Sequence, residues 1–182
     1  MANYLNSIKS VSLFRMERMK PYFVDKSPMI EELLPLIESG GSYVCITRPR
    51  RFGKSLMACM LAAFLEKGQD SEHMFCGLEI AQSRDYDKNR NAYHVFYFTL
   101  NEIPKGCRSY EQYIDRVESR ILEDLRAAYS QCRINEEESL WDILNDIYSE
   151  TEEGFVFVLD EWDIYSTVIL SATRTRTAIF CF

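Results

Sequence analysis

The segment from Ser42 to Leu65 constrains the fold of this chain more than any other. It begins with a short apolar run, passes through a turn that ends in Gly53-Lys54-Ser55, and continues as an apolar helix from Lys54 to Leu65. In such a strand–turn–helix unit, backbone N–H groups at the turn and at the helix N-terminus point at a common ligand, and the helix dipole favours negative charge there. The segment therefore predicts a phosphate-binding loop in an α/β fold.

The residue types in this loop indicate how it would hold a nucleotide. Lys54 would reach the β- and γ-phosphates, and the Ser55 hydroxyl would ligate Mg²⁺. The first glycine of the motif G-x-x-x-x-G-K-[ST] would fall at position 48, where arginine stands and Pro49 follows. The alternative interpretation is a basic loop before a surface helix, but the strand in front and the apolar helix behind favour the phosphate loop.

A second apolar strand ends in two carboxylates. Residues 155–159 read Phe-Val-Phe-Val-Leu, and Asp160 and Glu161 follow directly. A carboxylate at the C-terminal end of a buried strand lies where open α/β sheets bind ligands. Asp160 would hold Mg²⁺ together with Ser55, and Glu161 would act as the general base on water. The alternative is an acidic loop with no role in chemistry.

Strands and helices alternate along the chain, which predicts a three-layer α/β fold around a parallel sheet. Expected strands cover residues 43–47, 93–100 and 155–159. Ser27 and Pro28 have the residue types of a helix start, and Ser109 opens a capping box with Gln112. A further helix is expected from Ser139 to Tyr148.

Bulk properties limit the classes of function. A length of 182 residues suits one domain, and 47% apolar residues are enough to form a core. A net charge of −7 argues against a surface dominated by attraction to nucleic acid. The N-terminus lacks an apolar signal core and no apolar run approaches membrane-spanning length, so a cytoplasmic protein without membrane contact is expected.

Three segments together resemble the bacterial AAA-ATPase-like family. They are residues 22–26 (YFVDK), residues 47–55 (TRPRRFGKS) and residues 158–163 (VLDEWD). The resemblance implies a P-loop ATPase of the additional-strand class that uses ATP and Mg²⁺. It also explains the missing glycine, because members of the family carry the same R-P-R-R-F-G-K-[ST] loop.

Site residues carried over by the resemblance fall into four groups. Asp160 and Ser55 are the magnesium ligands, and Glu161 is the catalytic acid/base. Tyr22, Phe23 and Asp25 fall where related ATPases bring an N-terminal segment near the base of the bound nucleotide. The nucleotide-binding loop comprises Arg48, Pro49, Arg50, Arg51, Phe52, Gly53, Lys54 and Ser55.

The resemblance divides the chain into an N-terminal extension (1–20), a partial P-loop domain (21–163) and an atypical tail (164–182). Members of the family continue through further strands, so we expect the C-terminal strands of the sheet to be missing here. A reading-frame slip near Ile164 is one hypothesis for the tail, and the gene sequence would test it. Low stability and slow or absent hydrolysis are expected consequences.

Three functions remain open at this point. The first is an ATP-binding ATPase domain, the second a non-catalytic nucleotide-binding or regulatory module, and the third a small-molecule kinase. Adjacent carboxylates at a strand end favour water activation over a kinase acceptor site. Expected partners are ATP and either a second copy of the chain or another protein. Nucleic acid is expected only through a nuclease-like C-terminal domain that many members of the family carry.

Overall fold

The strands of the sheet run parallel to one another. The computed structural model describes residues 3–40, 43–47, 49, 51–99, 106–107, 109–135, 138–161 and 178–181. Within these ranges the strand order is β1-β4-β3-β2. Because parallel strands end on the same side of a sheet, their carboxyl ends share one edge, where open α/β sheets bind ligands. The strands are β1 Tyr43–Cys45, β2 His94–Thr99, β3 Phe155–Asp160 and β4 Ala178–Cys181.

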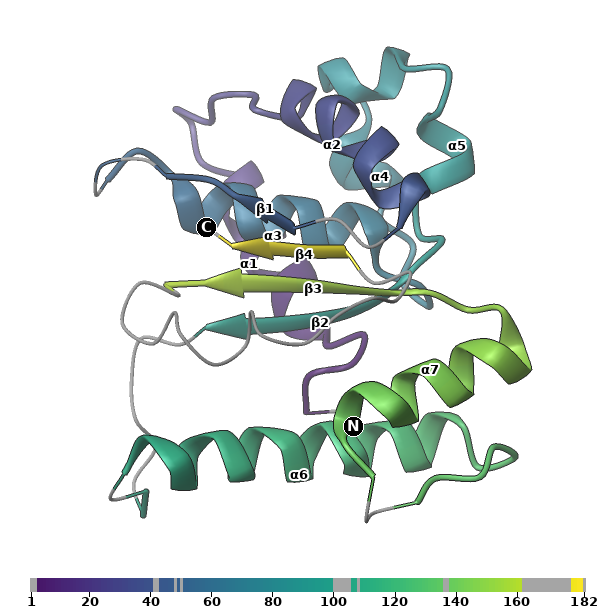
Figure 1. Cartoon of the computed structure of the whole chain (residues 1–182). Coiled ribbons are helices and arrows are strands. Elements are labelled where there is room, and N and C mark those ends of the chain that lie inside the picture. The colour runs from purple at the N-terminus through teal and green to yellow at the C-terminus, as the bar shows by residue number, and fades with distance from the viewer. Residues whose placement is uncertain are drawn as a thin grey trace.

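Helices cover both faces of this sheet. Figure 1 shows α6 and α7 (green) together on one side, away from the helices that precede β2 in the chain. No helix in the described ranges is long and apolar enough to cross a membrane. The helices are α1 Ile8–Arg18, α2 Pro28–Ser39, α3 Lys54–Leu65, α4 Glu72–Phe75, the 3₁₀ helix η1 Glu79–Gln82, α5 Tyr86–Asn89, α6 Tyr110–Ala128 and α7 Leu140–Thr151.

Side chains of β3 alternate between two hydrophobic clusters. Val156 and Val158 pack with α1, α2 and α3. Phe155, Phe157 and Leu159 pack with α6 and α7. Since successive strand residues point to opposite faces, Asp160 shares the face of Val156 and Val158, which is the face that α3 covers. The strand is apolar throughout because both of its faces are buried.

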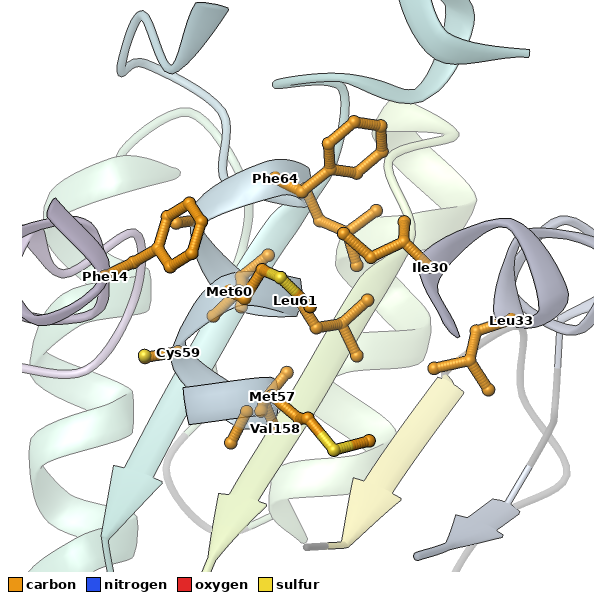
Figure 2. Packing of buried hydrophobic residues seen from close by; sticks show 14 of the residues in the cluster. Phe14, Ile30, Leu33, Met57, Cys59, Met60, Leu61, Phe64 and Val158 are labelled. Atoms are coloured by element: carbon orange, nitrogen blue, oxygen red, sulfur yellow. The ribbon is translucent and has the colours of Figure 1, made fainter. Parts of the chain in front are cut away.

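Helix α3 lies at the centre of the first cluster. Every residue from Met57 to Leu65 is buried, so the helix is covered on all sides. Figure 2 shows it between Phe14 of α1 and Ile30 and Leu33 of α2, with Val158 of β3 beneath. A helix held on every side fixes the position of its N-terminus. The first residues of α3 therefore rest on a rigid base.

Local sequence signals predicted several elements correctly. The bounds of α3 match the prediction. The Ser109 side chain accepts a hydrogen bond from the Gln112 N–H (3.3 Å) and begins α6. Ser139 caps α7, which continues to Thr151 rather than ending at Tyr148. Helix α2 also includes Pro35 and runs to Ser39, so the proline does not shorten it.

The prediction for Ser27 was correct for its position before the helix and wrong for its hydrogen bond. It precedes α2 as expected, but its hydroxyl makes no cap hydrogen bond within the helix. Its Oγ instead accepts a bond from the Ile80 N–H at 3.1 Å, in a buried environment. Tertiary packing thus uses this hydroxyl to join α2 to η1, which local spacing does not reveal.

Strand β4 corrects the prediction that the sheet ends with β3. Residues 178–181 form a strand that lies between β1 and β3, with Phe180 paired to both Val44 and Val158. The expected strand 43–47 is shorter and ends at Cys45, and it is the outermost strand beside β4 among the described strands. The short apolar run of β4 follows a Thr/Arg-rich stretch, so periodicity gave no signal for it.

Part of the N-terminal extension packs against the rest of the domain. Val11 and Phe14 of α1 are fully buried in the first cluster, and α1 packs along α3. Asp124 of α6 accepts the N–H groups of Asn3 (2.7 Å), Tyr4 (2.6 Å) and Leu5 (3.1 Å). Leu5 and the buried face of α1 therefore form part of the core.

Glu66, at the C-terminal end of α3, is a fully buried carboxyl group. Ser10 Oγ donates to its Oε2 at 2.6 Å, whereas Oε1 has no partner among the described residues. Burial raises the pKa of Glu66 from 4.5 to about 7, and the Ser10 bond opposes this rise. The folded protein therefore holds this proton more tightly than the unfolded chain does.

We expect Glu66→Gln to remove a pH-dependent loss of stability. With the folded pKa above the unfolded value, the wild-type contribution is fully present below pH 4.5 and is lost as the pH rises to about 7. In thermal unfolding, the free energy of unfolding of the variant should rise relative to that of wild type across this window, by roughly 3 kcal/mol at pH 8. Glu111→Gln, at an exposed position, is the control. A stability difference that does not change with pH would contradict the assignment.

Candidate functional site

The turn before α3 contains two residues in the left-handed region of the backbone map. Gly53 has a φ of 78° and Arg51 a φ of 70°. Glycine adopts this conformation without strain, whereas a non-glycine residue in it costs about 1–3 kcal/mol. Turns of this kind direct successive backbone N–H groups to one side, which makes them suited to anions. Lys54 and Ser55 are the first two residues of the helix that follows.

Asp160 ends β3 close to the start of α3. Its side chain is 3% exposed. Burial raises its pKa, while a hydrogen bond from the Ser55 side chain and the charge of Lys54 act in the opposite direction. These effects place Ser55 and Lys54 beside a carboxylate that is far away in the sequence. Packing of α3 on β3 brings the two predicted halves of the site together.

One oxygen of this carboxylate lacks a hydrogen-bond partner. Asp160 Oδ1 is buried and makes no hydrogen bond to any described residue. An ionised carboxylate without full compensation is costly in a protein interior. A carboxylate and a hydroxyl are oxygen ligands of the type Mg²⁺ selects. Asp160 and Ser55 therefore fit a magnesium ion, which would supply positive charge next to bound phosphates.

Two further side chains, Tyr97 and Cys59, lie near Asp160 on the face of β3 that α3 covers. Neither was predicted from the sequence as part of the site. Burial, followed by the charge of Asp160, raises the pKa of Tyr97. The pKa of the buried Cys59 thiol rises to about 12 because of burial and then the charges of Glu17 and Asp160. These groups stay neutral and make the surroundings of Asp160 poorly solvating. The alternation of side chains along a strand could have located Tyr97. In the sheet it pairs with Val158, which lies on the same face as Asp160.

Glu161 follows Asp160 with its backbone in the left-handed region, at a φ of 60°. It is partly exposed, in contrast to the buried Asp160. Its charge raises the pKa of Asp160, so the two carboxylates lie near each other. A strained backbone at such a position is common at functional sites, where surrounding structure maintains it.

The remaining predicted loop residues are only partly described. Pro49, Arg51 and Phe52 are exposed beside the start of α3. Arg48 and Arg50 lie outside the described residues. The structure thus brings together Lys54, Ser55 and Asp160, with Glu161 adjacent.

A cavity of about 400 Å³ opens next to this loop. Tyr22 and Phe23 line it, as do Phe52 and Gly53 of the loop.

The resemblance placed Asp25 near the base of the nucleotide. In the structure its carboxylate bonds two backbone groups. Oδ1 accepts a hydrogen bond from the Ser27 N–H and Oδ2 accepts one from the Glu79 N–H, each at 2.8 Å. Its pKa is lowered by these bonds although burial, the largest single influence, acts to raise it.

Comparison with known proteins identifies the family of this chain. The model of the predicted AAA-ATPase family matches residues 8–180. The match begins before Pro21 and continues past Asp163, so it is wider than the range expected from the motifs. No curated protein and no solved structure matches the chain significantly. Because the family model covers nearly the whole length, this chain belongs to the AAA-ATPase-like family.

Proposed function

We propose that this chain binds Mg²⁺–ATP in a P-loop site and hydrolyses the nucleotide. The loop from Arg48 to Ser55 would surround the phosphates, with Lys54 beside the β- and γ-groups. The cavity lined by Tyr22, Phe23 and Phe52 would receive the nucleoside. Family membership supports the assignment, as does the edge of the sheet at which these residues lie.

The observation that carries the proposal is the unpartnered oxygen of Asp160 beside Ser55. A buried aspartate with a purely structural role would have its oxygens satisfied by hydrogen-bond donors, as Asp124 of α6 has. The buried position leaves Asp160 with a charge that a cation would neutralise. This is the property expected of a magnesium ligand between a P-loop and its neighbouring strand.

Glu161 has a different role in the proposed reaction. Its carboxylate would accept a proton from the attacking water and orient that water toward the γ-phosphate. Lys54 and the backbone N–H groups of the loop would stabilise the charge that develops on the phosphoryl oxygens. Mg²⁺, when bound, would draw electron density from those oxygens. An arginine from a second copy or a partner protein would add to this stabilisation.

We expect Glu161→Gln to separate binding from hydrolysis. Removing the proton acceptor should lower phosphate release by about a hundredfold or more, while ATP affinity stays within about twofold of wild type. Phosphate release and calorimetric titration measure the two quantities. Glu32→Gln, at an exposed position on α2, should change neither.

Other outcomes would distinguish the alternatives. ATP binding without phosphate release in wild type would indicate a regulatory nucleotide-binding module. Phosphate transfer that requires an added acceptor would indicate a kinase. Absence of ATP binding would contradict the proposal as a whole.

A further inference from the structure

We propose that Lys26 is a positioning residue of the phosphate loop. Its ammonium group would hold the Arg51–Gly53 turn in the conformation that receives phosphate and would add positive charge beside it. This inference rests on the proposed function, and it assigns a role to a side chain outside the loop motif.

The contacts of Lys26 are with the loop backbone. Its Nζ donates to the Phe52 carbonyl oxygen at 2.7 Å. A Cβ built on Gly53 would lie 2.8 Å from the same Nζ, so the ammonium rests against the glycine itself. Lys26 therefore contacts the turn between Arg51 and Gly53, which both lie in the left-handed region.

The charge of Lys26 has no carboxylate partner among the described residues. Nearby Lys20, which lines the same cavity, differs because it forms an ion pair with Glu17. A single carbonyl leaves the ammonium with further donors and its full charge. A cation in this state attracts phosphate, whereas the charge of Lys20 is largely balanced by its neighbour.

The segment that carries Lys26 is itself fixed. Asp25 and Ser27, on either side, are bonded to the backbone of Glu79 and Ile80 in η1. Phe23 packs on the first hydrophobic cluster. Lys26 thus reaches the loop from a rigid base. A loop held in advance loses less conformational entropy when the nucleotide binds, which increases affinity.

The test compares Lys26→Met, Lys26→Arg and the control Lys88→Met by calorimetric titration with Mg²⁺–ATP. Lys26→Met should weaken binding about tenfold, because one charge-assisted hydrogen bond is lost. Lys26→Arg retains the charge and donors and should recover most of the affinity. Lys88 is paired with Glu38 and does not line the cavity, so Lys88→Met should remain within about twofold of wild type.

Limited trypsin digestion without nucleotide gives a readout that is independent of binding. Cleavage after Arg51 should be faster in Lys26→Met than in wild type, with an unchanged melting temperature. Wild-type ATP binding that is unaltered by Lys26→Met, or an equal loss in Lys88→Met, would overturn the role of Lys26. A wild-type protein that binds no ATP would instead reject the proposed function, so the two failures are distinguishable.

Discussion

Lys54→Ala should weaken ATP binding by at least about a hundredfold, because the ammonium is proposed to bond two phosphate groups and to balance their charge. Lys54 is the first residue of α3 and its charge acts on Asp160, so it lies at the proposed phosphate position rather than in the core. The fold should therefore remain, with little change in thermal unfolding. Titration calorimetry with Mg²⁺–ATP measures the loss.

Lys9→Ala is the matched control, since Lys9 is an exposed lysine near the start of another helix, α1. It should leave ATP affinity unchanged. Equal affinities in wild type and Lys54→Ala would remove the phosphate-loop interpretation. A loss of affinity accompanied by unfolding would show that Lys54 supports the structure instead of the ligand.

Asp160→Asn should make ATP binding insensitive to Mg²⁺ and should stabilise the nucleotide-free protein. Burial raises the pKa of Asp160, so its ionised form destabilises the native state as the pH rises above its unfolded value of 3.8. Asparagine keeps the shape and removes the charge, which should increase the free energy of unfolding at pH 7 by about 1 kcal/mol. Titrations with and without a chelator, together with thermal unfolding, measure both effects.

Asp124→Asn provides a contrasting control. Asp124 is also buried, but its two oxygens accept three backbone N–H groups of the N-terminal segment. This variant should destabilise the fold and keep the dependence of ATP binding on Mg²⁺. If Asp160→Asn binds ATP with wild-type dependence on Mg²⁺, then Asp160 is a structural residue.

Local chemistry in the sequence was sufficient for several parts of the fold. The apolar stretch of α3 and the all-apolar run of β3 specify their own conformations, because burial of such segments strongly favours one helix and one central strand. The caps at Ser109 and Ser139 depend on atoms three residues away. The association of Lys54 and Ser55 with Asp160 also follows from sequence, since parallel strands place their carboxyl ends at one edge.

Features that depend on distant contacts could not be predicted in this way. The insertion of β4 between β1 and β3 is a choice of strand order, and a four-residue apolar run carries no information about its neighbours. Ser27 has the residue type of a helix start, yet its side chain, like that of Asp25, bonds the backbone of η1 more than fifty residues later. Propensity describes what a segment prefers in isolation, and tertiary contacts overrode it here.

The sequence by itself determined the phosphate-loop motif, the two strand-end carboxylates and membership of an ATPase-like family. The tertiary structure decided two features of the site among the described residues: Asp160 Oδ1 has no hydrogen bond, and the Lys26 ammonium bonds a carbonyl oxygen but no carboxylate. Burial and hydrogen bonding are properties of the packed chain, because they depend on which distant groups fill the space around an atom. For that reason the chemical character of this site emerges only after α3, β3 and the segment before α2 have packed together.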